Sequence, residues 1–423
     1  MDDVSGTAPH IRVSKASPGY WQPLLILLLV GACAPLPPVP PTLPASAPTP
    51  LPRPQTTQPV TPYQEPVIRS QVQPLDFKLL GVPGSYNPTP SHWSLWDLQR
   101  WHERIYVAHG DWLANTGPVR AIYLDLENGE FIHDEGFIMD EEAIEVFRVC
   151  DDTLYAPGAD STESWDLGNL YFKPWGGGWT KRRAIPSAVH LWDVALLDGT
   201  LIVAGRIAAD DRGFGAVWAS ADGGMTWQPG PEFRGQGYAE ATSLFVLGEQ
   251  VYAPTVGTGC LVFDGSLWEK ADCLISDIFE GTAHVHKHAH FEEAVALVPY
   301  ACVTDTRLHL FDGKERWTVD FKQPVRDAVS VEGGLFVLTG LPTGEGAIFH
   351  APALSCHCTG DFTHVVQFRA EGGGTTLQGD EPSPCHLGSA PLSLEVARGR
   401  FYVGLADGRL YQSEMMALAG QED

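Results

Sequence analysis

Short stretches of apolar residues bounded by glycine, aspartate and proline recur along the chain from about residue 75 onward. Seven of them share one pattern: RIYVAHGD at 104, TLYAPGAD at 153, TLIVAGRI at 200, QVYAPTVG at 250, LVPYACVT at 297, GLFVLTGL at 334 and RFYVGLAD at 400. Each is followed by a second apolar stretch: AIYLDL at 121, NLYFKP at 169, AVWASA at 216, CLVFDG at 260, RLHLFD at 307, AIFHAP at 347 and RLYQSE at 409. Such segments, rich in β-branched and aromatic residues, are typical of strands. The pattern predicts seven strand pairs.

The spacing of these pairs predicts a β-propeller. The second stretches recur every 40 to 62 residues or so, centred in the range of propeller blades, and no helical periodicity separates them. Blades around an axis cover one another's faces and leave only short edges exposed. We therefore predict an all-β, seven-bladed propeller over residues 75–416, with a flexible tail at 417–423. The repeats diverge, so six or eight blades stay open. LDFKLLGV at 75–82 is expected to close the ring as an outer strand of the last blade.

The N-terminal residues are typical of an export signal. LLILLLVGAC at 24–33 follows Arg12 and Lys15 and is shorter than the roughly 20 residues needed to cross a bilayer. Residues 1–32 are predicted to be a signal peptide. Val30 to Cys33 resemble the bacterial lipobox, which implies lipidation at Cys33 and a place on a membrane of the bacterial cell envelope. The alternative is an ordinary A-x-A cleavage site at Ala32–Ala34, which would release a soluble secreted protein.

Residues 33–74 are dominated by proline and carry no apolar periodicity. Such a segment is expected to be disordered or polyproline-II-like. At about 3.1 Å per residue, thirty extended residues reach on the order of 100 Å. After a lipidated cysteine, we interpret this linker as a stalk that holds the propeller away from a membrane.

The turn SADGGMTW at 220–227 follows the second stretch of the third repeat. Weaker copies, VFDGSLW at 262 and LFDGKERW at 310, stand at the same place in other repeats. An aspartate or serine side chain can cap backbone N–H groups in a tight turn, glycine supplies a positive φ, and tryptophan covers the sheet. We therefore expect a structural role for its defining residues: Ser220, Asp222, Gly224, Thr226 and Trp227.

At every defining position this turn resembles the Asp-box of the BNR repeat family. Sialidase-like propellers, cell-surface sorting receptors and photosystem assembly factors share that repeat. The resemblance implies that the turns lie at the blade periphery, away from the central ligand face. It does not cover a sialidase active site, which needs three arginines and a tyrosine nucleophile with a carboxylate partner. The closest match to the family's Arg-Ile-Pro signature, RAIP at 183–186, has an extra residue and is expected between blades.

Four histidines alternate in AHVHKHAHF. Alternate side chains of a strand share one face at about 7 Å spacing, which can chelate zinc, copper or nickel when the strand bends. The segment is expected between blades, where loops meet the surface of the ring. The alternative is a strand whose histidines bind no metal. The predicted ligands are His284, His286, His288 and His290.

The cysteines suggest disulfides, because thiols of exported chains are oxidised. Cys260 and Cys273 flank a predicted hairpin, and Cys385 is expected to pair with Cys356 or Cys358. The alternative for the second group is a tetrahedral zinc site that includes His357 and His386. Of the 8 cysteines, seven remain beside Cys33, so at least one is unpaired. Cys150 and Cys302 are expected in the core.

The charge of the chain excludes one class of partner. With 27 Lys and Arg against 52 Asp and Glu, the net charge is −25, which repels nucleic acid. We predict a binding or assembly module that presents a ring face to a protein or glycan partner. A glycan-directed hydrolase is the second interpretation, and an exported metal-binding protein is the third.

Overall fold

The computed structural model describes most of the chain after the proline-rich segment. The predicted signal peptide, Cys33, the stalk up to residue 67 and the C-terminal tail lie outside the described residues. Within the described ranges, no helix is long and apolar enough to span a membrane. The structure describes residues 68–73, 75–87, 94–111, 117–207, 214–232, 240–255, 259–271, 285–300, 304–332, 334–353, 361–370 and 387–416.

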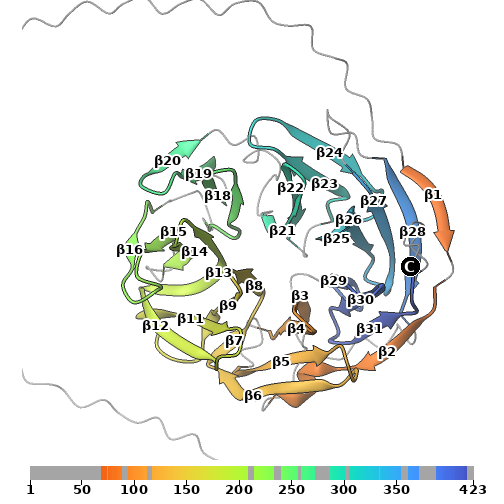
Figure 1. Cartoon of the computed structure of the whole chain (residues 1–423), viewed down its shortest axis with the longest axis horizontal. Coiled ribbons are helices and arrows are strands. Elements are labelled where there is room, and N and C mark those ends of the chain that lie inside the picture. The colour runs from red at the N-terminus through yellow and green to blue at the C-terminus, as the bar shows by residue number, and fades with distance from the viewer. Residues whose placement is uncertain are drawn as a thin grey trace, which may run out of the picture. The chain divides into compact units, whose positions relative to one another are not determined.

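Seven sheets surround a common axis (Figure 1), which confirms the seven-bladed β-propeller. From the innermost strand outward, blade 1 comprises β3 (Leu95–Trp101), β4 (Arg104–His109), β5 (Val119–Asp125) and β6 (Phe131–Met139). Blade 2 comprises β8 (Arg148–Cys150), β9 (Thr153–Pro157), β11 (Leu167–Pro174) and β12 (Thr180–Pro186), and blade 3 comprises β13 (Ala188–Leu197), β14 (Thr200–Ile207), β15 (Phe214–Ser220) and β16 (Gln228–Pro229).

The remaining blades follow the same order. Blade 4 comprises β17 (Phe245–Leu247), β18 (Gln250–Thr255), β19 (Gly259–Phe263) and β20 (Trp268–Ala271), and blade 5 comprises β21 (Val285–Phe291), β22 (Ala294–Pro299), β23 (Arg307–Phe311) and β24 (Arg316–Asp320). Blade 6 comprises β25 (Val325–Val331), β26 (Gly334–Gly340), β27 (Glu345–Ala351) and β28 (Phe362–Arg369). Blade 7 comprises β29 (Pro391–Ala397), β30 (Arg400–Leu405), β31 (Leu410–Ser413) and β2 (Phe77–Gly81).

The strand pairs recognised in the sequence are the second and third strands of each blade. The innermost strands were missed, because they carry charged residues inside otherwise apolar segments: LWDLQRW in β3, VHKHAHF in β21 and VRDAVSV in β25. A charge in such a segment weakens the apolar signal of a strand. The structure shows that these charges line the inside of the ring.

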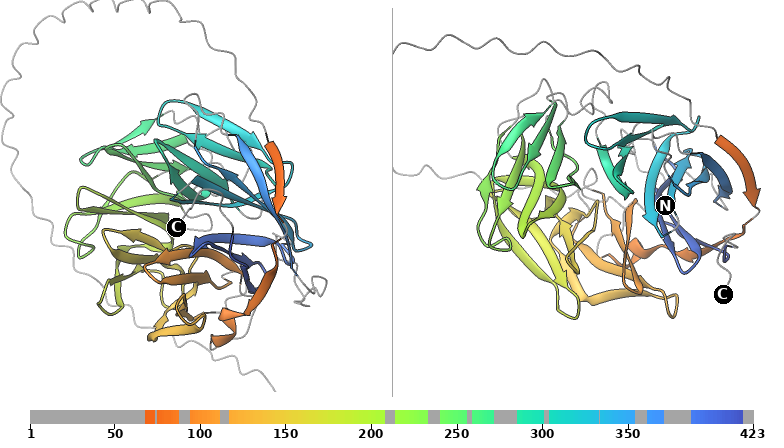
Figure 2. Two further views of the ribbon diagram at one scale, coloured as in Figure 1. Left: turned by 45° about the vertical axis from the view of Figure 1, so that its right-hand side comes forward. Right: turned by 45° about the horizontal axis from the view of Figure 1, so that its top comes forward.

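The N-terminal strands close the ring. β2 pairs antiparallel with β31, with Leu79 opposite Tyr411, which confirms the predicted closing strand. β1 (Ile68–Gln73) pairs parallel with β28 and becomes a fifth strand of blade 6. Both views of Figure 2 show β1 beside that blade. The ordered sheet therefore begins at Ile68, seven residues before the start at 75 that the repeats suggested.

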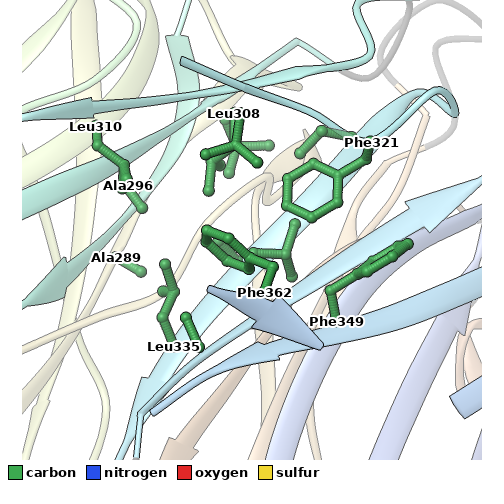
Figure 3. Packing of buried hydrophobic residues seen from close by; sticks show 14 of the residues in the cluster. Ala289, Ala296, Leu308, Leu310, Phe321, Leu335, Phe349 and Phe362 are labelled. Atoms are coloured by element: carbon green, nitrogen blue, oxygen red, sulfur yellow. The ribbon is translucent and has the colours of Figure 1, made fainter. Parts of the chain in front are cut away.

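Apolar side chains fill the spaces between neighbouring blades. Between blades 5 and 6, Phe321 packs against Phe349 and Phe362, with ring centroids 4.7 and 5.2 Å apart (Figure 3). Ala289 of β21 and Leu335 of β26 belong to the same buried cluster. Each sheet thus buries its faces against its neighbours, as closure of a propeller requires.

A ladder of short strands links the ends of blades 1, 2 and 3. β7 (Glu141–Ala143) pairs with β10 (Ala159–Ser161), and Ala159 is opposite His190 of β13. Glu141 is buried below this ladder, where Asn169 Nδ2 donates a hydrogen bond of 2.5 Å and Tyr171 Oη one of 3.1 Å to its Oε1. Burial raises the pKa of Glu141 to about 8. Between β2 and β3 in the chain, Pro83–Tyr86 form a short 3-10 helix, η1.

Candidate functional site

Three buried aspartates connect successive blades at the inner wall of the ring. Asp97, Asp193 and Asp327 each follow a register shift in β3, β13 and β25 respectively. Such a bulge re-aims a side chain, here toward the next blade. Each carboxylate accepts a hydrogen bond from a backbone N–H of the following blade: Phe147 N at 3.2 Å, Leu244 N at 2.8 Å and Leu394 N at 2.8 Å.

The repeated bonds fix the direction of the inner strands. This hydrogen bond from an aspartate to the next blade joins blade 1 to 2, blade 3 to 4 and blade 6 to 7. The innermost strands therefore point the same way along the axis of the ring. The turns between the innermost and second strands therefore lie together at one end of the ring. We call this end the hairpin face; its turn residues are His102–Glu103, Asp151–Asp152, Asp198–Gly199, Gly248–Glu249, Glu292–Glu293, Glu332 and Arg398–Gly399.

A buried lysine ties several blades together across the ring. Lys287 of β21 is 3% exposed, and its Nζ donates to Asp327 Oδ2 at 2.8 Å and to the Leu392 carbonyl at 3.1 Å. The same Nζ lies 3.7 Å from Asp97 Oδ1. Burial of a charge is tolerated only when it is paired and hydrogen-bonded. These bonds link blades 5, 6, 7 and 1.

A second buried ion pair lies between blades 2 and 3. Arg148 Nε donates to Asp193 Oδ1 at 2.9 Å, and its Nη2 approaches Oδ2 at 3.3 Å. Ser243 Oγ donates to the same Oδ2 at 3.3 Å and lies 3.1 Å from His288 Nδ1. Asp193 is completely buried. Both cations of the wall described so far are thus engaged by carboxylates of neighbouring blades.

Burial changes the ionisation of the carboxyl groups in this wall. It raises the pKa of Asp327 to about 6, although the Lys287 charge opposes that rise. Burial also raises the pKa of Glu395 to about 8. The hydrogen bonds that Val396 N and Arg100 N donate to this carboxyl group, at 2.8 and 2.7 Å, act in the opposite direction and lower the pKa. At neutral pH the Glu395 carboxyl group is therefore mostly protonated. Desolvation favours that uncharged form.

A cavity of about 510 Å³ opens at the hairpin face. Its walls come from blades 1, 2, 6 and 7, so it lies at the end of the central channel. Its volume is in the range that small ligands or a few side chains of a partner occupy. The lining combines charged, apolar and aromatic groups: Gln99, Arg100, Trp101, His102, Val149, Asp152, Val329, Ser330, Val331, Glu332 and Glu395.

One rim of the cavity carries an aromatic cluster. His102 Nε2 lies 2.7 Å from Asp152 Oδ1, and the His102 ring packs against Trp175 with centroids 3.7 Å apart. Trp175 is 45% exposed, whereas Trp101 is 3% exposed. Trp101 Nε1 has no hydrogen-bond partner within the described ranges. The rim thus offers the exposed aromatic surface of Trp175 beside the buried Trp101.

The histidine segment forms a strand, β21, but this strand is the innermost strand of blade 5 and does not lie between blades. A register shift between Val285 and Lys287 interrupts its alternation. His288 and His290 lie together with ring centroids 5.6 Å apart. His286 instead contacts Tyr300 and Trp96, at 5.1 and 6.3 Å between ring centroids.

The metal site stays a prediction. His284 lies outside the described residues. Across the described ranges, no group of three or more His, Cys, Asp or Glu side chains is arranged to hold a metal ion. Burial lowers the pKa of His288 well below the ordinary value and also lowers that of His290, so both are neutral at pH 7.

The Asp-box turn lies between β15 and β16, on the outer half of blade 3. Asp222 Oδ1 accepts hydrogen bonds from Met225 N and Thr226 N, both at 2.9 Å, and Ser220 Oγ accepts one from Gly224 N at 2.7 Å. Thr226 Oγ1 donates to Asp222 Oδ2 at 2.6 Å. These bonds, that of the Thr226 side chain first, hold the pKa of Asp222 well below its ordinary value. Its carboxylate is fully used inside the turn, as a structural role requires.

Two further features of this turn fit the same role. Gly223 and Gly224 have φ values of 69° and 85°, which glycine adopts without strain. Trp227 is 9% exposed and packs in the core between blades 2 and 3. The turn therefore covers the edge of the sheet and does not reach the central channel.

Most of the cysteines cannot be placed. Cys260 is buried on β19, but its predicted partner Cys273 lies outside the described residues, as do Cys302, Cys356, Cys358 and Cys385 with His357 and His386. The predicted disulfides and the alternative zinc site stay predictions. Cys150, on β8, is a free and partly buried thiol, and burial raises its pKa to about 11.

Among the described residues, Arg183 and the three arginines of the innermost strands β3, β8 and β25 have separate partners and do not form a shared carboxylate clamp. RAIP at 183–186 belongs to β12, the outermost strand of blade 2, and not to a connection between blades. Arg183 bonds to Glu163, Asp166 and Ser164 at that outer edge. On the inner strands, Arg100, Arg148 and Arg326 are held by separate partners: the His102 carbonyl, Asp193 and the Gly340 carbonyl.

Sequence reasoning missed the inner-wall aspartates and the cavity. A signal was present, because an acidic residue precedes an apolar residue in each of these inner strands: Asp97–Leu98, Asp193–Val194, Asp327–Ala328 and Glu395–Val396. The turn residues of the hairpin face were equally visible, since they directly precede the first stretch of nearly every repeat.

Comparison with known proteins supports the fold. No family model and no curated protein matches the sequence. Virginiamycin B lyase from Staphylococcus aureus is similar in structure, with 6% identity, a TM-score of 0.52, and coverage of 81% of this chain and 100% of that chain. A catalytically inactive form of that lyase with quinupristin gives 7% identity, a TM-score of 0.51 and the same coverage. The Pan2 WD40 domain of Neurospora crassa gives 12% identity and a TM-score of 0.49 over 80% of this chain and 95% of that chain. At these identities the likeness concerns the β-propeller fold alone.

Proposed function

We propose that this protein is an exported, membrane-tethered β-propeller that binds a protein partner at its hairpin face. The observation that carries the proposal is the cavity of about 510 Å³ at the end of the channel. The cavity brings charged, aromatic and apolar side chains of blades 1, 2, 6 and 7 together at an opening. A propeller fold is consistent with a binding or assembly role. Because a fold does not specify a ligand, the ligand-binding surface is inferred from the residues of the site.

The interior of the ring favours binding at its end over chemistry inside it. The buried cations Lys287 and Arg148 are each paired with carboxylates of neighbouring blades. Removing a partner from such a pair leaves an uncompensated charge, so these groups are committed to holding the blades together. The exposed residues of the cavity rim, in contrast, leave the fold intact when they engage a ligand. Ser330, Glu332 and Trp175 are examples.

The chemistry of the rim suits a protein surface. Aromatic and arginine side chains are enriched where proteins bind one another. The exposed Arg100 lines the partly apolar cavity, and the exposed Trp175 packs against His102 of the cavity lining. Val149 adds an apolar contact that is 38% exposed.

The predicted signal peptide, lipidation at Cys33 and proline-rich stalk give the proposal its location. A stalk on the order of 100 Å long lets the propeller reach a partner while it remains attached to the bacterial envelope. Metabolic labelling with an alkyne-tagged fatty acid tests this part. Label on the wild-type chain but not on Cys33→Ser supports the tether; equal or absent label on both contradicts it.

A site-specific photo-crosslink tests the binding face. A photoreactive residue at Ser330, which is exposed and lines the cavity, is expected to capture one discrete partner in the native envelope. The matched control is Thr343, which is exposed in the turn between β26 and β27 of the same blade, at the opposite end of the ring. Products that appear at both positions alike, or at neither, would contradict a partner at the hairpin face.

A further inference from the structure

Two carboxyl groups lie side by side on the ladder formed by β7 and β10. The register of this antiparallel pair places Ala143 opposite Ala159, so the adjacent residues Glu142 and Asp160 are also opposite each other. Directly opposite side chains of antiparallel strands lie on the same face, with Cβ atoms about 4.5–5.5 Å apart. The fold therefore brings the two acidic side chains together.

A third acidic residue extends this pair into a row. Gly110, which follows the end of β4, forms an antiparallel bridge with Ala143, and Asp111 N donates a hydrogen bond of 3.2 Å to the Glu142 carbonyl. Asp111 is therefore opposite Glu142. Since β4 begins at a turn of the hairpin face, its other end lies at the opposite end of the ring. We call Asp111, Glu142 and Asp160 the acidic row.

The two faces of the ladder provide for their carboxyl groups differently. On one face, Glu141 Oε1 accepts hydrogen bonds from Asn169 and Tyr171. On the other face, Glu142 is 8% exposed, and its buried Oε2 has no hydrogen-bond partner in the described part of the chain. Asp160 Oδ1 is likewise buried and has no partner among the described residues. A buried acceptor without a donor destabilises a fold, so packing of the blades does not account for these two oxygens.

The charges of the acidic row act on one another. Burial, followed by the carboxylates of Asp160 and Asp111, raises the pKa of Glu142 to about 7, which agrees with a shared face. Burial also raises the pKa of Asp160, and the charge of Arg206 opposes that rise. Arg206 Nη1 in turn donates to Glu240 Oε1 at 3.4 Å. The positive charge of this arginine is therefore divided between the row and another carboxylate.

The geometry of the acidic row indicates the class of ligand. Its residues come from three neighbouring chain segments, and paired strands are about 4.8 Å apart. Metal ions need oxygen ligands that converge at about 2.0–2.6 Å, and within the described ranges no group of three or more His, Cys, Asp or Glu side chains is arranged in that way. An ammonium group instead donates three separate N–H bonds to acceptors about 2.8 Å away. Because it is compact and sits on a slender stem, it reaches a nearly buried carboxylate more easily than a planar guanidinium.

We propose that the acidic row binds a primary ammonium group, which donates hydrogen bonds to Glu142 Oε2 and Asp160 Oδ1 while Asp111 adds negative charge. A free alkylamine and the lysine side chain of a peptide both present this group. The site lies at the opposite end of the ring from the hairpin face, and it does not depend on the partner proposed there.

A ligand-observed NMR titration of the full chain tests the chemistry. The probe is n-butylammonium, and its counterpart is tetramethylammonium at equal ionic strength, which carries the same charge without an N–H donor. We expect saturable binding of butylammonium and at least about tenfold weaker binding of tetramethylammonium, because the latter cannot donate hydrogen bonds to the two buried oxygens. Equal binding of both cations, or no binding of butylammonium, would overturn the proposal.

Matched amide variants test the position of the site. Glu142→Gln/Asp160→Asn keeps the size of both side chains and removes their charges. Glu127→Gln/Asp198→Asn makes the same changes at two exposed turn residues. We expect butylammonium to bind at least about tenfold more weakly to the first variant and within about twofold of the wild type to the second. Equal loss in both variants would mean that the acidic protein attracts cations without a specific site, which overturns the proposal.

Stability separates ligand binding from a structural role of the acidic row. Because opposed like charges destabilise a sheet, the ligand-free Glu142→Gln/Asp160→Asn protein is expected to unfold at the same temperature as the wild type or a higher one. A lower midpoint, or failure to fold, would show that these carboxylates hold the ladder together and would overturn the proposal.

A lysine-containing tripeptide with blocked ends distinguishes the two sources of the ammonium group. Tighter binding than that of butylammonium assigns the site to a lysine of a partner, and weaker binding assigns it to a free amine. The photo-crosslink at Ser330 is expected to be unchanged in Glu142→Gln/Asp160→Asn, since Ser330 lies at the hairpin face. The amine titration and the crosslink therefore test the two proposals separately.

Discussion

Lys287 Nζ and Asp327 Oδ2 are 2.8 Å apart at the inner wall of the ring, with side chains 3% and 4% exposed. Lys287→Met removes the cation and leaves Asp327 buried beside Asp97. Because breaking a buried pair leaves an uncompensated charge, we expect a loss of about 3–5 kcal/mol in the free energy of unfolding. Urea denaturation measures it. Arg69→Met is the control: its pair with Asp361 is exposed, and a change below about 1 kcal/mol is expected. Equal losses of stability in Lys287→Met and Arg69→Met would show that the buried pair does not hold the blades together.

Glu395 makes stability depend on pH. Its pKa in the folded protein is about 8, above that of an unfolded glutamate, so the folded state retains a proton that the unfolded state has lost. Stability contributed by this group is therefore complete at low pH and falls between about pH 4.5 and 8, by at most about 1.4 kcal/mol per pH unit. Glu395→Gln cannot ionise, so the stability of this variant relative to the wild type should rise from pH 5 to pH 8. A constant difference in stability between Glu395→Gln and the wild type across that pH range would contradict a raised pKa of Glu395.

Asp222 is expected to matter for stability and not for binding. Asp222→Ala removes the hydrogen bonds from Met225 N, Thr226 N and Thr226 Oγ1, and these turn groups lose their acceptor. The urea midpoint should fall, while the yield of the crosslink from Ser330 stays at the wild-type value. Loss of the crosslink in a variant that is still folded would instead place this turn at the partner interface.

Gly158 is required by close packing against Glu141. A Cβ atom at residue 158 would overlap the buried Glu141 carboxyl group, which is itself held by Asn169 and Tyr171. Gly158→Ala is therefore expected to cost about 1–3 kcal/mol, the usual range for overpacking. At Gly178 the added Cβ approaches only the partly exposed side chain of Glu135, so Gly178→Ala should change stability far less. The thermal unfolding midpoints of both variants test this prediction, and equal midpoints would contradict it.

Closure of the ring predicts different results for two N-terminal deletions. Removal of residues 1–67 leaves every described strand in place, and the propeller should retain its unfolding midpoint. Removal of residues 1–81 also deletes β1 and β2, which exposes the edge of β31 and part of the blade 7 core that Phe77 contacts. We expect this shorter chain to unfold at lower temperature or to aggregate. Equal midpoints would mean that the closing strand contributes little.

The sequence predicts the fold well because the second and third strands of each blade are buried on both faces. TLIVAG at 200 and GLFVLT at 334 read as continuous apolar runs. The innermost strands do not form continuous apolar runs, because Asp97, Lys287 and Asp327 interrupt them. Those charges are paired only with residues far away in sequence, so no local pattern shows that they are buried.

The candidate site was hidden for a related reason. The cavity is formed by residues of four blades, from Gln99 to Glu395, and a one-dimensional pattern does not bring them together. The histidine alternation in β21 was conspicuous, yet a register shift at Val285–Lys287 separates His286 from His288 and His290.

The most direct test of a binding role for the hairpin face compares two exposed valines. Val149 lines the cavity and is 38% exposed, and Val72 on β1 is 44% exposed. The measurement is the amount of the crosslink-defined partner that co-purifies with full-length protein from its native cells, for wild type, Val149→Arg and Val72→Arg. Our account predicts that Val149→Arg loses the partner and that Val72→Arg retains it at the wild-type level. Retention by Val149→Arg, or equal loss in both folded variants, would contradict it.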